Sequence, residues 1–358
     1  MKKVALTIVR LFVAVLFVSA AVFPAMASDV RMQVQSAFAL RSAGLGTTIV
    51  WTAEKIKEAS QGSIQLNLFE PGKLVPAFEV LDAVSTGKIQ AGYACANYWQ
   101  GKMPSAPLFG SVPFGPTISG YLAWLYHGNG MKLYQELYDQ GGYNVKVLVC
   151  GILGPDSGGW FRKPVETPAD LKGLKMRIAG FGGNALQKLG VSVSLVPIGE
   201  AFSALEKGAI DAIEIGSPAI DKPSGIYKIA KYNYFPGWHQ PSTIIELLIN
   251  KTLWNKLSKQ QQSMIEMACY AGTLEGIAYG ESLQGPIMKD NAGKHGVINR
   301  RWSKQMLSAI NGAWMEVVAE MKAKDPFFKK VWDDMSVFFP AYNYWEAYGS
   351  LPTPEPTK

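Results

Sequence analysis

Arg177 is the residue of this chain whose type and setting most clearly suggest binding chemistry. It stands in the strand-like triplet Met176–Ile178, directly before the glycine-rich turn Gly180–Gly183 and a new helical segment. In α/β folds, ligands bind where a strand ends and a helix begins. A planar guanidinium can hold a carboxylate through two parallel hydrogen bonds. Chemistry alone leaves an alternative equally open, in which Arg177 pairs with a structural acid on the surface.

Catalytic motifs do not accompany this arginine. The sequence contains no G-x-S-x-G, no H-E-x-x-H and no P-loop, and the glycine-rich turn is not followed by GK[ST]. Only three histidines are present, which argues against a metal site built on histidine. The three cysteines form no C-x-x-C pair, and we expect Cys95 and Cys150 to be small buried hydrophobes. We therefore expect a binding protein rather than an enzyme, without a catalytic cofactor.

The elements that must position Arg177 alternate between strand and helix. The stretches Arg31–Phe38 and Ile64–Phe69 alternate apolar and polar residues like strands, and Ile49, Ala53 and Ile56 between them follow helical spacing. Such alternation indicates an α/β fold. A mature chain of about 330 residues exceeds what one core usually supports, so we expect two lobes.

One short pattern occurs twice, as VSTGKIQA (Val84–Ala91) and as LEKGAIDA (Leu205–Ala212). In each segment a helix ends at a glycine, Gly87 or Gly208, that can adopt the left-handed conformation, and a strand follows. Two similar α/β lobes explain the pattern. A coincidence between two common helix-to-strand turns is the alternative.

Two apolar runs, Val145–Gly154 and Ser242–Asn250, are the expected hinge strands between the lobes. After them the chain becomes helical, first over Ser258 to about Lys289, then in a helix capped by Ser303 and ended by Pro326. The aromatic segment that follows could pack on a lobe or pair with a second copy. The predicted parts are a signal peptide at 1–27, lobe 1 at 28–150 with later C-terminal segments returning to it, lobe 2 at 151–250, helical segments spanning the lobes at 251–350 and a disordered tail at 351–358.

The first 27 residues have the pattern of a secretory signal peptide. Lys2, Lys3 and Arg10 precede the apolar run Leu11–Phe23, and small residues follow in an Ala-x-Ala arrangement that ends at Ala27. This pattern predicts cleavage after Ala27 and a periplasmic protein. The apolar run is shorter than the roughly 20 residues of a membrane span, so an uncleaved anchor is the weaker alternative. Removing the three signal cations lowers the formal charge from +7 to +4, and no Lys/Arg run predicts a nucleic-acid partner.

Five stretches together point to one family, although each alone is weakly specific. They are LFEPGKLVPAFEVLDAVSTGKIQAGYA (Leu68–Ala94), GGWFRKPVETPADLKGLKMRI (Gly158–Ile178), VPIGEAFSALEKGAIDA (Val196–Ala212), YFPGW (Tyr234–Trp238) and LINK (Leu248–Lys251). With them, nearly all the mature chain resembles the DctP family, the solute-binding component of tripartite ATP-independent periplasmic (TRAP) transporters. It looks closest to the branch that binds 2-oxo acids or lactate together with a metal ion.

This resemblance implies a two-lobed periplasmic-binding-protein clamp of α/β class, with hinge strands, long C-terminal helices and the ligand in the cleft. The family's carboxylate-gripping arginine falls on Arg177. Its metal-holding positions fall on Asp156, on Glu214 and, through the backbone, on Ile215. Asp156 would also contact the substrate. The other positions that would line the substrate are Phe38, Asn97, Tyr98, Trp160, Phe181, Trp238 and His239.

The sequence departs from that branch at three of these positions. Asp156 stands where an amide is expected, and Ile215 and His239 stand where aromatic residues are expected. Ile215 puts the identity of the ligand in doubt, because it opens space or makes one wall aliphatic. His239 either adds a hydrogen-bond donor or lies at the surface of a lobe.

The change to Asp156 permits a count of charges in the expected site. Asp156 and Glu214 contribute −2, Arg177 contributes +1 and a monocarboxylate contributes −1. A monovalent cation such as Na⁺ would leave −1 and a divalent cation would bring the site to zero, and buried net charge is costly. Oxygen ligands suit a hard cation such as Ca²⁺, so we hypothesise a divalent metal–carboxylate complex. In the competing interpretation, both acids accept hydrogen bonds from hydroxyls or an amine on a larger ligand.

The expected function is that of a periplasmic solute receptor, which binds a 2-oxo or 2-hydroxy monocarboxylate and delivers it to the TRAP permease in the membrane. The C-terminal aromatic segment and the resemblance also predict a homodimer. Three alternatives stay open. They are a receptor for a larger polar or sugar-acid ligand without metal, a receptor of an ATP-driven transporter or a sensor, and a periplasmic enzyme on the same clamp.

Overall fold

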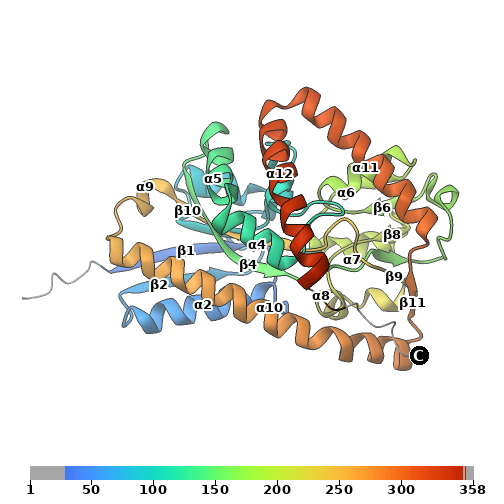
Figure 1. Cartoon of the computed structure of the whole chain (residues 1–358). Coiled ribbons are helices and arrows are strands. Elements are labelled where there is room, and N and C mark those ends of the chain that lie inside the picture. The colour runs from blue at the N-terminus through green and yellow to red at the C-terminus, as the bar shows by residue number, and fades with distance from the viewer. Residues whose placement is uncertain (1–28, 350, 352–358) are drawn as a thin grey trace, which may run out of the picture.

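The computed structural model describes residues 29–349 and 351, and it contains two β-sheets that lie side by side (Figure 1). The first sheet has five strands in the order β2-β1-β3-β10-β4, and the second has six in the order β11-β9-β5-β8-β6-β7. Helices pack on both sheets, as an α/β fold requires. The predicted signal peptide at 1–27 and the tail from 352 onward lie outside the described residues. Within the described ranges, no helix combines the length and apolar character needed to cross a bilayer.

The first lobe is built on a βαβαβ unit. Its elements are β1 (Val30–Ser36), α2 (Gly46–Ala59), β2 (Ile64–Phe69), α3 (Val80–Ser85) and β3 (Ala91–Ala94). Strand β1 pairs in parallel with both β2 and β3. Over Val30–Gln33 buried and exposed residues alternate, which is the period of two that the sequence showed, and the last three residues of the strand are all buried.

The second lobe repeats this unit. Its elements are β6 (Lys175–Arg177), α6 (Phe181–Lys188), β7 (Ser192–Ser194), α7 (Ile198–Glu206) and β8 (Ala212–Ile213). Strand β6 pairs in parallel with both β7 and β8. Gly87 and Gly208, which precede β3 and β8, have φ angles of 78° and 71°. The recurring sequence pattern therefore reflects two lobes with the same topology.

Antiparallel strands extend each sheet beyond its unit. In the first sheet, β10 (Thr243–Asn250) lies between β3 and β4 (Val145–Leu153). In the second, β5 (Gly159–Phe161) pairs with β8 and with β9 (Tyr232–Phe235), and β11 (Ile298–Arg301) pairs with β9. The sequence predicts lobe 2 over 151–250, but β10 belongs to the first sheet. Every residue of β10 is buried, so this strand is stable only between two neighbours of one sheet.

The chain crosses between the sheets in short loops and in helices. The loops at 154–158 and 236–242 connect β4 to β5 and β9 to β10, so the crossings lie beside the predicted hinge strands rather than within them. Helix α10 (Lys259–His295) contacts α2 and β4 in the first lobe and α8 (Pro218–Asp221) in the second. Figure 1 shows it running along both lobes. The helix begins at a capping box formed by Ser258 and Gln261, and Gly296 in the left-handed conformation ends it. It extends six residues beyond the predicted end at Lys289.

The C-terminal helices return to the first lobe. Ser303 caps α11 (Lys304–Lys324), as predicted, and α11 packs on α6 of the second lobe. The aromatic segment forms α12 (Pro326–Gly349), which packs on α4 (Ile118–His127) of the first lobe. The remaining short elements are η1 (Ala77–Glu79), η2 (Ala96–Trp99), η3 (Ala106–Phe109), α5 (Gly130–Gln140), η4 (Pro168–Leu171), η5 (Lys222–Ser224), η6 (Ile226–Lys228) and α9 (Lys251–Trp254).

Candidate functional site

The ends of the parallel strands of both lobes meet at one cavity. Phe38 follows β1 and Asn97 follows β3 in the first lobe, whereas Arg177 ends β6 and Glu214 follows β8 in the second. The carboxyl ends of parallel strands are the binding edge of an α/β sheet. Because the two lobes share one topology, each presents this edge to the other.

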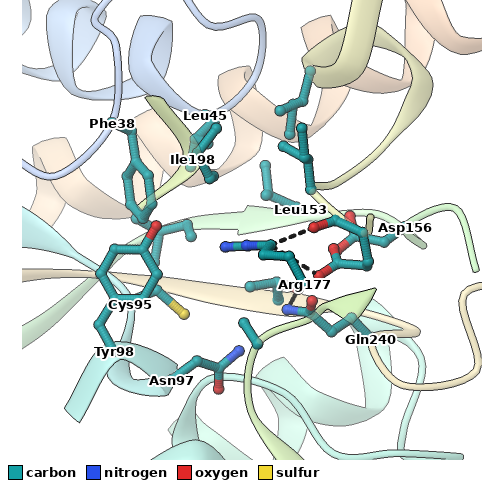
Figure 2. A pocket seen from close by; sticks show the side chains of 16 residues that line it. Phe38, Leu45, Cys95, Asn97, Tyr98, Leu153, Asp156, Arg177, Ile198 and Gln240 are labelled. Carbon is teal, nitrogen blue, oxygen red and sulfur yellow. Dashed lines mark hydrogen bonds and ion pairs between the residues drawn. The ribbon is translucent and has the colours of Figure 1, made fainter. Parts of the chain in front are cut away.

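The cavity is small and largely buried, with a volume of about 40 Å³. Polar side chains reach it from both lobes, and aliphatic and aromatic side chains fill the rest of its wall (Figure 2). The lining residues are Phe38, Leu45, Cys95, Asn97, Tyr98, Leu153, Asp156, Arg177, Ala179, Ile198, Glu214, Ile215, Ile220, Gln240, Thr243 and Ile245. A site of this size suits a ligand of few atoms.

Hydrogen bonds to the second lobe hold the side chain of Arg177 in place. Its side chain is 2% exposed, so the alternative of an ordinary surface ion pair is wrong. Its Nε donates to the carbonyl of Val196 at 3.1 Å, and its Nη1 donates to the carbonyl of Glu214 and to Glu214 Oε2, the latter at 3.2 Å. Figure 2 shows the guanidinium between Tyr98 on one side and Asp156 on the other. These bonds fix the plane of the guanidinium and leave Nη2 outside them.

Two buried carboxylates stand beside this arginine. Burial raises the pKa of Asp156 well above its usual range, Glu214 and Asp221 raise it further, and Arg177 lowers it. Burial also acts to raise the pKa of Glu214, but His239, Arg177 and the backbone N–H of Ala179 outweigh it and lower the pKa. The two acids therefore differ, because Arg177 forms a direct ion pair with Glu214, whereas Asp156 has mainly acidic neighbours.

The donor set at this point fits a cation. Ligand atoms of Asp156, Glu214 and His239 all lie within 4.8 Å of one another, and all three residues are buried. Two oxygens that bind one Ca²⁺ at about 2.4 Å can be at most about 4.8 Å apart. Asp156 Oδ1 and Glu214 Oε1 have no hydrogen-bond partner among the described residues. Such orphaned buried oxygens carry a desolvation cost that a bound cation would offset.

Four residues that the sequence predicts at the ligand do not line the cavity. Trp160 lies behind it and donates from Nε1 to Asp221 Oδ2 at 2.6 Å. Phe181 points away toward α11 and α12, where it packs on Trp314 and Phe328. Trp238 stacks on Phe114, and its neighbour His239 faces Glu214 rather than the open space.

Sequence reasoning missed two buried acids that support the site. Asp221 on α8 accepts the bond from Trp160, and burial raises its pKa well above the usual range. Nothing in the sequence around Asp221 signals this role. Glu246 accepts hydrogen bonds from Trp99 at 2.6 Å, from Tyr138 at 2.6 Å and from Tyr134. The sequence does offer a signal for Glu246, because it is the one charged residue in the apolar strand TIIELLIN.

The Glu246 network positions part of the cavity wall. Trp99 belongs to η2, the same short helix that carries Asn97 and Tyr98 to the cavity. Asn97 donates to Ser111 Oγ at 2.9 Å, whereas its Oδ1 has no partner among the described residues. Burial raises the pKa of Tyr98 to about 12, and its hydroxyl also lacks a partner in the part of the chain that the structure describes. Asn97 and Tyr98 thus offer fixed polar atoms that a ligand can use.

Two lobes of equal topology that close on a buried, charged cavity define a clamp-type solute-binding protein. The chain belongs to the DctP family, bacterial extracellular solute-binding protein family 7, whose sequence model matches residues 44–325. The resemblance found in the sequence and the predicted two-lobed α/β clamp are therefore confirmed.

One curated relative is similar in sequence, and two solved structures share the fold. A monocarboxylate 2-oxoacid-binding periplasmic protein of Nostoc sp. is 34% identical over 300 residues, which cover 84% of this chain and 81% of the relative. A TRAP solute-binding protein of Pseudoalteromonas atlantica with bound sodium and pyruvate has a TM-score of 0.86 at 31% identity, covering 91% of this chain and 100% of that one. A TRAP solute-binding protein of Bordetella bronchiseptica also has a TM-score of 0.86, at 28% identity, covering 89% and 95%. It crystallised as a mixed-occupancy dimer, with copurified calcium and picolinate in one site and the other site apo.

Proposed function

We propose that this chain is a periplasmic receptor that captures a small 2-oxo or 2-hydroxy monocarboxylate together with a divalent cation. It would then deliver the acid to the membrane permease of a TRAP transporter. The observation that carries this proposal is the buried Arg177 beside Asp156 and Glu214 in a cavity of about 40 Å³. Relatives bind pyruvate with sodium and picolinate with calcium, and the Nostoc relative binds monocarboxylate 2-oxo acids.

In this proposal, Arg177 binds the carboxylate of the ligand, and the cation neutralises the two acidic side chains. The outer edge of the guanidinium donates to the ligand carboxylate, while its inner edge stays fixed on Val196 and Glu214. The cation would be held by Asp156 and Glu214, with Ile215 at the same wall, and it would neutralise their charge. Asp221 is left out of the count because it does not line the cavity and accepts hydrogen bonds from Trp160 and Ser157. A bound cation would keep Asp156 ionised in spite of the burial that raises its pKa. Two acids, one bound monocarboxylate and one arginine together carry a net charge of −2. A divalent cation therefore neutralises the site.

Capture would follow from closure of the two lobes. The lobes meet edge to edge at the cavity and are joined by the loops 154–158 and 236–242 and by long helices. Rotation about these loops opens the cavity, and ligand contacts from both lobes stabilise the closed form. We propose binding without turnover, and location in the periplasm after removal of residues 1–27.

Calorimetric titration with pyruvate tests the metal and the ligand together. We expect binding to the calcium-loaded protein and a loss of affinity of about 100-fold or more after complete chelation, because two buried carboxylates then face the anion. Unchanged affinity without metal would contradict the divalent complex. Mass spectrometry of small molecules that copurify with the protein tests the alternative, since a sugar acid or a larger polar ligand would replace the monocarboxylate proposal.

We also propose that the receptor forms a homodimer through apolar surface on α10 and α12. Met267, Tyr270 and Leu274 lie on one face of α10 and are 52–71% exposed. Tyr344, Trp345 and Tyr348 on α12 are 66–77% exposed. Between them α4 packs on α12 and forms an apolar groove with α10. Exposed apolar side chains gathered in this way mark an interaction site, and the Bordetella relative is a dimer.

A further inference from the structure

His239 brings an imidazole to the cation-binding carboxylates. It lies in the loop between β9 and β10, and its side chain is fully buried. Its Nε2 is 3.5 Å from Glu214 Oε1, and ligand atoms of His239, Glu214 and Asp156 lie within 4.8 Å of one another. His239 is therefore neither at the surface of a lobe nor a donor toward the open part of the cavity.

The atoms that face one another here lack hydrogen bonds. Neither His239 Nδ1 nor His239 Nε2 has a partner among the described residues, and the same holds for Asp156 Oδ1 and Glu214 Oε1. A buried imidazole normally donates from one nitrogen and accepts at the other. The distance from His239 Nε2 to Glu214 Oε1 fits a direct ion pair, but the pair does not meet hydrogen-bond geometry. Three unpartnered groups that converge on one point indicate a ligand held between them.

The surrounding chain makes room for this imidazole. A Cβ atom on Gly182 would lie 2.6 Å from His239 Cβ, so only glycine fits there. Trp238 covers the other side, with its ring centroid 5.3 Å from that of the imidazole. Gly182, in the first turn of α6, thus has a packing role beside His239.

We propose that His239 completes a three-residue metal site with Asp156 and Glu214, which favours a first-row divalent transition metal such as Zn²⁺. This inference rests on the proposed function and specifies its cation. Imidazole suits Zn²⁺ and its neighbours, whereas Ca²⁺ takes oxygen ligands. Two ligands about 2.1 Å from one tetrahedral ion are about 3.4 Å apart, and His239 Nε2 and Glu214 Oε1 are 3.5 Å apart. A 2-oxo acid would then supply further oxygens to the same ion.

The experiment isolates the imidazole of His239. The chain has three histidines, so the H127Q/H295Q double variant leaves His239 as the only imidazole. His127 lies in the groove beside α10 and His295 lies against Tyr227, so neither belongs to the site. The full mature chain of this variant, without an affinity tag, is stripped of metal and loaded with Mn²⁺ for pulsed electron paramagnetic resonance. Zn²⁺ and Ca²⁺ affinities are measured by calorimetry, in this background and with His239→Phe added.

We expect nitrogen couplings to Mn²⁺ in the background variant and their loss in His239→Phe. We expect Zn²⁺ affinity to fall by about 100-fold with His239→Phe, while Ca²⁺ affinity changes by less than about threefold because calcium does not need the imidazole. Absence of nitrogen couplings in the background variant would overturn the inference. The measurement on the background variant keeps His239 in place. It therefore tests the inference even if His239→Phe fails to fold.

Pyruvate binding separates this inference from the proposed function. If the calcium-loaded protein binds pyruvate but Mn²⁺ shows no nitrogen coupling, the histidine ligand is wrong and the receptor proposal stands. If nitrogen couplings appear but no small monocarboxylate binds with any cation, the metal site stands and the proposed ligand is wrong.

Discussion

At the scale of single residues, one edge of the Arg177 guanidinium already forms hydrogen bonds within the protein before a solute binds. Its Nε and Nη1 bind Val196 and Glu214, so the guanidinium is held in one plane. Lysine cannot reproduce this arrangement, because an ammonium group has no planar fork. The pre-oriented plane lowers the cost of ordering a side chain when the ligand binds.

Arg177→Lys should therefore lower the affinity for pyruvate by about 100-fold or more while the protein stays folded. Calorimetry in the presence of calcium measures the affinity, and thermal unfolding checks the fold. Arg162→Lys is a matched control, because Arg162 binds the carbonyl of Leu205 and lies outside the cavity lining. Equal affinities for the two variants would contradict a direct role of Arg177.

Asp156 supplies one of the negative charges at the proposed cation site. Asp156→Asn removes one negative charge, so a monovalent cation should then neutralise the site with a bound monocarboxylate. We expect pyruvate binding by this variant to depend less on calcium and to be supported by sodium. Titrations with each ion, in both proteins, measure the change. A variant that keeps the calcium dependence of the parent would show that Asp156 does not set the charge of the cation.

At the scale of elements, α10 approaches α2 closely along a row of glycines. A Cβ atom on Gly272 would lie 2.0 Å from Thr52 Oγ1, and one on Gly276 would lie 2.0 Å from Thr48 Oγ1. Thr48 cannot easily yield, because its hydroxyl donates to the carbonyl of Gly44 at 2.7 Å. Since α10 also contacts α8, this close packing ties the second lobe to the first.

Gly276→Ala should destabilise the protein by about 1–3 kcal/mol, because the added methyl group overlaps Thr48. Gly293→Ala in the same helix is the control, since nothing lies within 4 Å of its Cβ position. That control should stabilise the protein by about 0.5–1 kcal/mol through reduced chain entropy. Denaturant unfolding measures both. Similar effects of the two substitutions would rule out the steric explanation.

At the scale of the whole molecule, α12 has an inner and an outer face. Its first turns are part of the core, because Trp332 stacks on Phe328 and packs on Trp314. Its last turns expose Tyr344, Trp345 and Tyr348. Deleting the chain from Trp332 would therefore uncover the core as well as the proposed interface, so point substitutions test the dimer better.

The double variant Trp345→Glu/Tyr348→Glu should be monomeric, because two added charges on each copy would be buried without partners in the interface. Sedimentation velocity of the parent and the variant measures the change in oligomeric state. Ile298→Glu, at an exposed position of the edge strand β11, should leave the dimer intact. A parent protein that sediments as a monomer would exclude the homodimer.

The sequence alone determined the class of this protein and much of its architecture. Apolar periodicity is local, so β2 could be predicted over Ile64–Phe69 and the start of α11 at Ser303. The recurring glycine turn predicted two similar lobes. This prediction was possible because a left-handed helix cap depends only on the few residues around the glycine. Arg177 could be singled out as well, since a strand end before a glycine-rich turn is visible in the chain order.

Only the tertiary structure decided which residues share the cavity. Sheet membership of β10 depends on pairing with strands far away in the chain, so the predicted lobe boundary at 250 missed it. Trp160 and Phe181 turn away because partners from other elements hold them elsewhere: Trp160 donates to Asp221, and Phe181 packs on Phe328. His239, which the sequence predicts at the substrate, has instead a setting that suits a metal ligand, because the fold places it beside Glu214 and Asp156. Local patterns specify elements, whereas a site depends on distances between elements that no local pattern contains.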